Sequence, residues 1–83
     1  MNEVTYGAVD KALRSLGFTC RLLREEPAAR WYEHQETGAI VSLPLLPEDD
    51  QVYPHHLAAV QGTLKVYGIA DPLDFAAELE KAS

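Results

Sequence analysis

Three histidines are the side chains in this sequence best suited to acid–base chemistry, and the neighbours of His34 make it the main candidate. Arg30 and Tyr32 precede it at alternate positions, so an extended chain would place all three on one side. An imidazole beside a guanidinium and a phenol could catalyse cleavage of a phosphodiester. The simpler interpretation is a surface histidine near a hairpin turn. His34 is therefore a candidate catalytic residue with a non-catalytic alternative.

The other reactive side chains do not form a recognisable metal or nucleophile site. His55 and His56 are adjacent, so on a helix they diverge by about 100° instead of meeting at one ion. Cys20 lies in a predicted strand and suits a core thiol better than a nucleophile, which needs exposure and a nearby base. Glu48-Asp49-Asp50 lacks the alternating oxygen ligands of a calcium loop. The sequence predicts no metal and no cofactor.

Arginine and aromatic side chains form the strongest candidate for a binding surface. The set comprises Arg21, Arg24, Arg30, Trp31 and Tyr32. Aromatic residues on a sheet can stack on RNA bases, but Trp, Tyr and Arg are also the usual anchors of protein interfaces. Four glutamates in the same stretch disfavour the binding of a polyanion such as RNA: Glu25, Glu26, Glu33 and Glu36. We therefore expect a protein-binding surface, with RNA binding as the alternative.

A helix that precedes these residues is predicted over residues 5–16. Thr5 suits the N-cap because its hydroxyl can accept a hydrogen bond from the first turn. Val9, Leu13 and Leu16 recur at spacings of four and three, which places them on one face of the helix. Gly17 supplies the left-handed residue that ends many helices.

Three short strands are predicted next, over residues 18–22, 30–34 and 39–43. The first alternates apolar and polar residues, the second is aromatic, and Pro27 interrupts the chain between them. A hairpin-type turn at Gly38 joins the second and third strands. Short connections favour an antiparallel meander. The pattern leaves open whether Trp31 or Tyr32 faces outward, because both sets of alternate residues mix apolar and polar types.

Two further helices follow an acidic, proline-containing loop. One is predicted to begin near Pro54 and to end at Gly68, with a buried stripe of Leu57, Val60, Leu64 and Tyr67. The other is short, with Asp71 as its cap. The predicted fold is thus α+β: a helix, a three-stranded antiparallel meander, a helix and a short C-terminal helix. Helices on one side would leave the second face of the sheet open, and we expect that face to be the working surface.

Length and composition predict a single domain spanning residues 1–83. The chain has a hydrophobic fraction of 47% and a net charge of −6, and that charge counts against nucleic-acid binding. The single cysteine excludes an internal disulfide. The acidic N-terminus does not resemble a signal peptide, and no apolar run could span a bilayer. We therefore expect a cytoplasmic protein that does not associate with membranes.

Several of these features together resemble the HicA family of small toxins, from residue 4 to roughly residue 80. They are a first helix ending in Gly17-Phe18, then Tyr32-Glu33-His34, the turn at Gly38, Val41-Ser42-Leu43-Pro44, and a second helix ending in Gly68-Ile69. The resemblance implies a fold like that of the double-stranded-RNA-binding domain. It also implies metal-independent RNA cleavage and an antitoxin as protein partner.

The sequence departs from that family at the catalytic signature, a glycine-serine-histidine stretch that opens the second strand. Pro27-Ala28-Ala29 stands in its place, with Ala29 where the histidine would lie. We therefore expect a HicA-like domain without nuclease activity. It would bind an antitoxin-like protein, or a second copy of itself, through the open sheet face around Arg30, Trp31 and Tyr32. The alternative is a toxin–antitoxin mRNA endoribonuclease, or an RNA-binding domain, that uses His34 as a displaced histidine.

Overall fold

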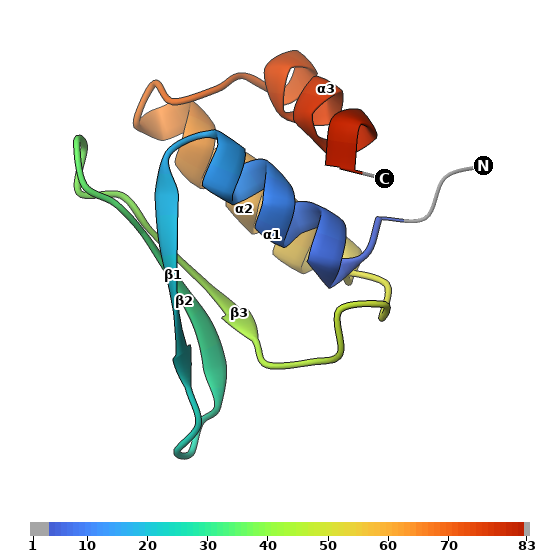
Figure 1. Ribbon diagram of the computed structural model, residues 1–83. Helices are drawn as coiled ribbons and strands as arrows, with labels where there is room; N and C mark the ends of the chain where they lie inside the picture. The colour runs from blue at the N-terminus through green and yellow to red at the C-terminus, as the bar shows by residue number, and fades with distance from the viewer. Residues whose placement is uncertain (1–3, 83) are drawn as a thin grey trace.

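A computed structural model describes residues 4–82 of the chain (Figure 1). Its elements are, in order, α1 (Tyr6–Ser15), β1 (Phe18–Leu23), β2 (Ala29–His34), β3 (Ile40–Pro44), α2 (Pro54–Val66) and α3 (Pro72–Ala82). The predicted α+β order of one helix, three strands and two helices is confirmed. The single domain over residues 1–83 stays a prediction, and residues 1–3 and 83 lie outside the described part.

Helix α1 begins and ends where local chemistry predicts. The Thr5 hydroxyl accepts a hydrogen bond of 3.2 Å from the Ala8 backbone N–H, which makes Thr5 the N-cap. Leu16 is the C-cap, and Gly17 follows with φ of +100°, a left-handed conformation that glycine adopts without strain. The chain therefore turns directly from α1 into β1.

The three strands form one antiparallel sheet in the order β1-β2-β3, as the meander requires. Side chains alternate between its two faces, so each cross-strand row belongs to one face. One row that faces the helices is Cys20, Tyr32 and Val41; the neighbouring row, which faces away from them, is Arg21, Trp31 and Ser42. The outward face of the central strand is therefore the face of Trp31.

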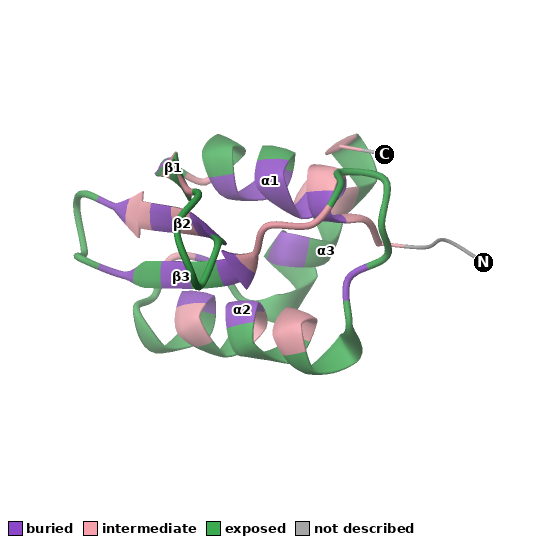
Figure 2. Cartoon of the chain, turned by 90° about the horizontal axis from the view of Figure 1, so that it is seen from below, coloured by how far each residue is buried: buried purple, intermediate pink, exposed green. Residues whose placement is uncertain are grey.

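All three helices lie on the same side of this sheet (Figure 1). Helix α1 packs on β1, α2 packs on β3, and α3 packs mainly against α1 on the side away from the sheet. The buried segments of α1, α2 and the strands point toward one another in Figure 2, where they are purple. The largest fully buried side chains are Tyr6, Tyr32, Phe75, Leu13, Leu64, Val9 and Val60. In the described part of the chain the second face of the sheet carries no helix, which agrees with the predicted one-sided packing.

Helix α2 starts at Pro54, whose missing N–H costs least at a first helical position. Val60 and Leu64 are its buried residues. Tyr67 was predicted to continue this stripe, and that prediction is wrong. Tyr67 is the C-cap, beyond the last helical turn, and its side chain is exposed.

Helix α3 begins as its sequence predicts. The Asp71 carboxylate accepts a hydrogen bond of 2.8 Å from the Asp74 backbone N–H, which confirms Asp71 as the cap. Phe75 is buried, and Leu79 packs against the core. None of the helices within residues 4–82 has the length and apolar character needed to cross a membrane.

Candidate functional site

The alternation of β2 divides the predicted site residues between the two faces of the sheet. Trp31 and Glu33 face outward, whereas Arg30, Tyr32 and His34 face the helices. The prediction that Arg30, Tyr32 and His34 share one face is therefore confirmed. That face is the covered one, however, so the open face keeps only part of the predicted binding surface.

Trp31 is held in place on the open face by a carboxylate. Its indole Nε1–H donates a hydrogen bond of 2.9 Å to Glu33 Oε1, and the same oxygen lies 3.7 Å from the Arg21 guanidinium. Arg21 stands directly opposite Trp31 in the β1–β2 pair. Because all three side chains are partly or largely exposed, this ion pair contributes little to stability. Its effect is to fix the orientation of the indole ring.

Two hollows flank Trp31 on this face. The first, of ≈ 550 Å³, lies toward the β1–β2 hairpin and is lined by Leu22, Leu23, Arg24, Glu25, Glu26, Pro27, Ala29, Trp31 and Ser42. The second, of ≈ 320 Å³, is polar and is lined by Thr19, Cys20, Arg21, Trp31, Glu33 and Gln35. Arg24 belongs to the rim of the first hollow. The open face thus brings together Arg21, Arg24 and Trp31 of the predicted set.

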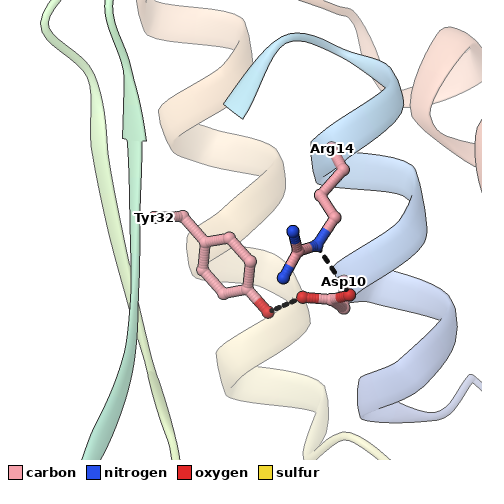
Figure 3. Close-up of polar contacts among 3 residues, drawn as sticks. All are labelled: Asp10, Arg14 and Tyr32. Carbon is pink, nitrogen blue, oxygen red and sulfur yellow. Dashed lines mark hydrogen bonds and ion pairs between the residues drawn. The ribbon is translucent and has the colours of Figure 1, made fainter. Parts of the chain in front are cut away.

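Tyr32 does not belong to this face, which corrects its assignment to the binding surface. The residue is 0% exposed, and its hydroxyl donates a hydrogen bond of 2.8 Å to Asp10 Oδ1 across the core (Figure 3). Burial, with the hydrogen bond to Asp10, raises the pKa of the phenol well above its ordinary value. Tyr32 is therefore a structural link between β2 and α1.

Asp10 is the polar residue of this core that the sequence interpretation overlooked. Its second carboxylate oxygen accepts a hydrogen bond of 3.0 Å from Arg14 Nε, one helical turn further along α1 (Figure 3). The hydrogen bond to Asp10 raises the pKa of the Arg14 guanidinium. The signal was present, because Tyr6, Asp10 and Leu13 fall on one stripe at spacings of four and three.

Arg30 also lies on the helix-facing side, so its placement on the open face was wrong. The residue is 9% exposed, and one terminal nitrogen donates a hydrogen bond of 2.9 Å to the Leu46 carbonyl. Its Nε has no hydrogen-bond partner in the described part of the chain. Arg30 therefore holds the loop between β3 and α2 and is not presented to a partner.

His34 is buried as well, which corrects its interpretation as a surface histidine. The residue is 8% exposed, and its Nδ1 hydrogen-bonds with Thr37 Oγ1 at 2.9 Å. Its ring packs against Phe18 with the centroids 5.0 Å apart. A Cβ placed on Gly17 would lie 3.2 Å from Nε2, so the turn at Gly17 lies close to the other ring nitrogen. A general base must reach its substrate, and this environment leaves little room for one.

The other two histidines lie at the start of α2 with two tyrosines. The His55 and His56 ring centroids are 4.2 Å apart, and His56 Nδ1 lies 3.3 Å from the hydroxyl of buried Tyr6. Burial, and then the neighbouring His55, lowers the pKa of His56. Within residues 4–82, no three His, Cys, Asp or Glu side chains meet as a metal site would require.

The chain was compared with models of known protein families, with curated proteins and with solved structures, and none of them matches it.

Proposed function

We propose that this chain is a HicA-like domain without nuclease activity that binds a protein partner through the open face of its sheet. The observation that carries the proposal is Trp31, an aromatic side chain oriented by Glu33 on a face that no helix of residues 4–82 covers. Aromatic residues fixed in this way lose little conformational entropy on binding and are frequent interface anchors. The partner would be an antitoxin-like protein or a second copy of the chain, in a cytoplasm whose reducing conditions suit an unpaired Cys20.

The charges of the face favour a protein partner over RNA. Arg21 is paired with Glu33, and Arg30 points into the core, so within residues 4–82 Arg24 is the one arginine of the predicted set without an ion pair or a buried hydrogen bond. An RNA surface depends on several cations that neutralise phosphates, and the chain as a whole carries a net charge of −6. Tyr32 is also unavailable for stacking, so a single aromatic residue remains.

The environment of His34 disfavours the competing ribonuclease. Its ring packs against Phe18, lies close to Gly17 and is hydrogen-bonded to Thr37. Removing it is expected to loosen the turn between β2 and β3 rather than to abolish a reaction. The test is incubation of the purified chain with a labelled structured RNA, with and without EDTA. We expect neither cleavage nor a shift, and metal-independent cleavage that His34→Ala abolishes would overturn the proposal.

The binding proposal is tested by comparing three forms of the tagged chain as bait for proteins from its own host cells. The forms are wild type, Trp31→Ala and Tyr67→Ala. Tyr67 is an exposed aromatic residue outside the sheet, so its variant controls for the loss of any surface ring. We expect the Trp31→Ala chain to retain the partner at least about tenfold less well than the other two forms. Equal retention by all three forms would exclude the open face as the binding surface.

A further inference from the structure

The hollow beside the β1–β2 hairpin has a shape and lining that indicate what the open face binds. It occupies ≈ 550 Å³ between Trp31 and the hairpin, and its lining includes the apolar residues Leu23, Pro27 and Ala29. A depression of this size with such a lining excludes water best when it accepts an aliphatic side chain. The indole forms one wall, and its N–H is already bonded to Glu33. The ring therefore offers apolar surface to an occupant of the hollow.

The rim of the hollow carries charged side chains that are exposed to solvent. Glu25 and Glu26 are exposed, and neither takes part in an ion pair or a side-chain hydrogen bond within residues 4–82. Arg24 stands beside them on the rim, so the local balance is one base against two acids. The chain as a whole carries a net charge of −6, and the field of this charge attracts cations and repels anions. Both the local and the overall charge therefore favour a cationic partner.

We propose that this hollow binds an extended segment of a basic protein, with an aliphatic side chain against Trp31 and a neighbouring Lys or Arg beside Glu25 and Glu26. The proposal rests on the proposed function, because it names the chemistry of the partner at the same face. The aliphatic side chain supplies burial in the hollow, and the flanking cation supplies the charge that the rim lacks. The second hollow, with Arg21 and Glu33, lies on the other side of Trp31 and lengthens the surface available to the segment.

Trp31 provides the readout, because it is the one tryptophan of the chain. The probes are three blocked hexapeptides that alternate Leu with Lys, Leu with Glu, and Ser with Lys, titrated while the Trp31 emission is recorded. We expect the Leu–Lys peptide to give a saturable change and to bind at least about tenfold more tightly than the other two. If the Ser–Lys peptide bound as tightly as the Leu–Lys peptide, the proposal that an aliphatic side chain anchors the segment would be overturned. Equal or tighter binding of the Leu–Glu peptide would overturn the charge assignment.

Rim variants test the sign of the charge at the site itself. Glu25→Gln with Glu26→Gln is expected to weaken binding of the Leu–Lys peptide about fivefold, whereas Arg24→Gln leaves it unchanged or strengthens it. Glu36→Gln with Glu48→Gln is the matched control, because it also removes two negative charges but at residues that do not line the hollow. A loss in the control equal to that in the rim variant would show that net charge alone acts, and would overturn the site.

Failure of this inference and failure of the proposed function give different results. A host partner lost on Trp31→Ala, with no response to the Leu–Lys peptide, would overturn the basic segment and leave the face as a binding surface. Self-association that quenches Trp31 and competes with the peptide would identify a second copy as the occupant. Unchanged capture of the host partner by Trp31→Ala would remove both proposals.

Discussion

Asp10 joins two elements that lie far apart in the sequence. Its carboxylate accepts hydrogen bonds from Tyr32, across the core, and from Arg14, on its own helix. A buried carboxylate is costly unless donors replace the water it has lost, and these two contacts supply them. The arrangement fixes α1 over the central strand with a directional contact that apolar packing alone does not provide.

Tyr32→Phe should therefore destabilise the fold by about 1–3 kcal/mol, because it keeps the ring but leaves a buried carboxylate oxygen without its donor. Urea unfolding followed by circular dichroism measures the loss. Tyr67→Phe is the matched control, since the Tyr67 side chain is exposed, and it should change the free energy of unfolding by less than about 0.5 kcal/mol. Equal effects of the two substitutions would mean that the Tyr32–Asp10 hydrogen bond does not contribute.

The turn between α1 and β1 is an element in which backbone conformation and packing act together. Gly17 takes a φ of +100°, and its Cα faces the ring of His34. Because His34 ends β2, the turn and the central strand are packed directly against one another. Gly17 therefore lies beside one edge of the imidazole, whose opposite nitrogen is hydrogen-bonded to Thr37.

Gly17→Ala should cost more than the same substitution at Gly68. Both glycines have positive φ, so alanine adds about 1 kcal/mol of backbone strain at either site. Only at Gly17 does the added methyl approach another side chain, 3.2 Å from His34 Nε2, whereas nothing lies within 4 Å at Gly68. Thermal unfolding of both variants measures the difference. A Gly17→Ala chain as stable as Gly68→Ala would show that His34 can move aside freely.

The first turn of α2 gives the fold a pH dependence on the acid side. The pKa of His56 lies below its ordinary value of 6.5, so the unfolded chain takes up this proton at a higher pH than the folded chain does. The contribution of His56 to the free energy of unfolding is therefore fully present above pH 6.5, falls as the pH drops through that value, and levels off below the folded pKa.

His56→Asn should reduce this loss of stability. Asn keeps an acceptor near the Tyr6 hydroxyl but does not titrate, so the difference in unfolding free energy between about pH 7.5 and about pH 5.5 should shrink. Urea unfolding at the two pH values measures it. His55→Asn is the control with the adjacent ring, and it should leave more of the pH dependence in place. An unchanged difference in His56→Asn would assign the effect to other groups.

For the whole molecule, the uneven distribution of charge is the dominant electrostatic property. Residues 44–83 carry seven acids and two bases, whereas residues 1–43 carry six acids and five bases. The net charge of −6 produces self-repulsion, which opposes the compact state. Salt screens that repulsion over a distance of about 10 Å at moderate ionic strength.

Added sodium chloride should therefore stabilise the chain and raise its Tm by roughly 3 °C between low and moderate salt. Thermal unfolding at increasing salt gives the measurement. Glu36→Gln with Asp49→Asn, which reduces the net charge from −6 to −4, should show a smaller salt effect. A salt effect of the same size in that variant would argue against self-repulsion as the cause.

The order of the elements could be predicted because each boundary follows from residues next to it. The Thr5 cap, Gly17, Pro54 and the Asp71 cap act within a few positions of themselves, and their local contacts are those observed. The three strands were recognised in the same way, from alternation and aromatic content. Local rules were therefore sufficient for the fold class.

Which side chains of β2 point toward the helices could not be predicted, because the orientation depends on a distant residue. Trp31 and Tyr32 are both large, aromatic and able to donate a hydrogen bond. Tyr32 is turned inward, where it meets the carboxylate of Asp10, 22 positions earlier in the chain. The burial of His34 likewise depends on contacts with Phe18 and Gly17. Long-range contacts of this kind leave no periodic signal in the strand itself.

The inward side of β2 has a consequence for how this sequence avoids misfolding. A slip of the central strand by one position would turn Trp31 and Glu33 toward the helices, and apolar content alone would penalise that competing structure only weakly. The slip would break the contacts of Arg30 with Leu46, Tyr32 with Asp10 and His34 with Thr37 together. The three polar contacts therefore select the native register of the central strand. They make the native arrangement unique where hydrophobicity by itself would leave two nearly equivalent alternatives.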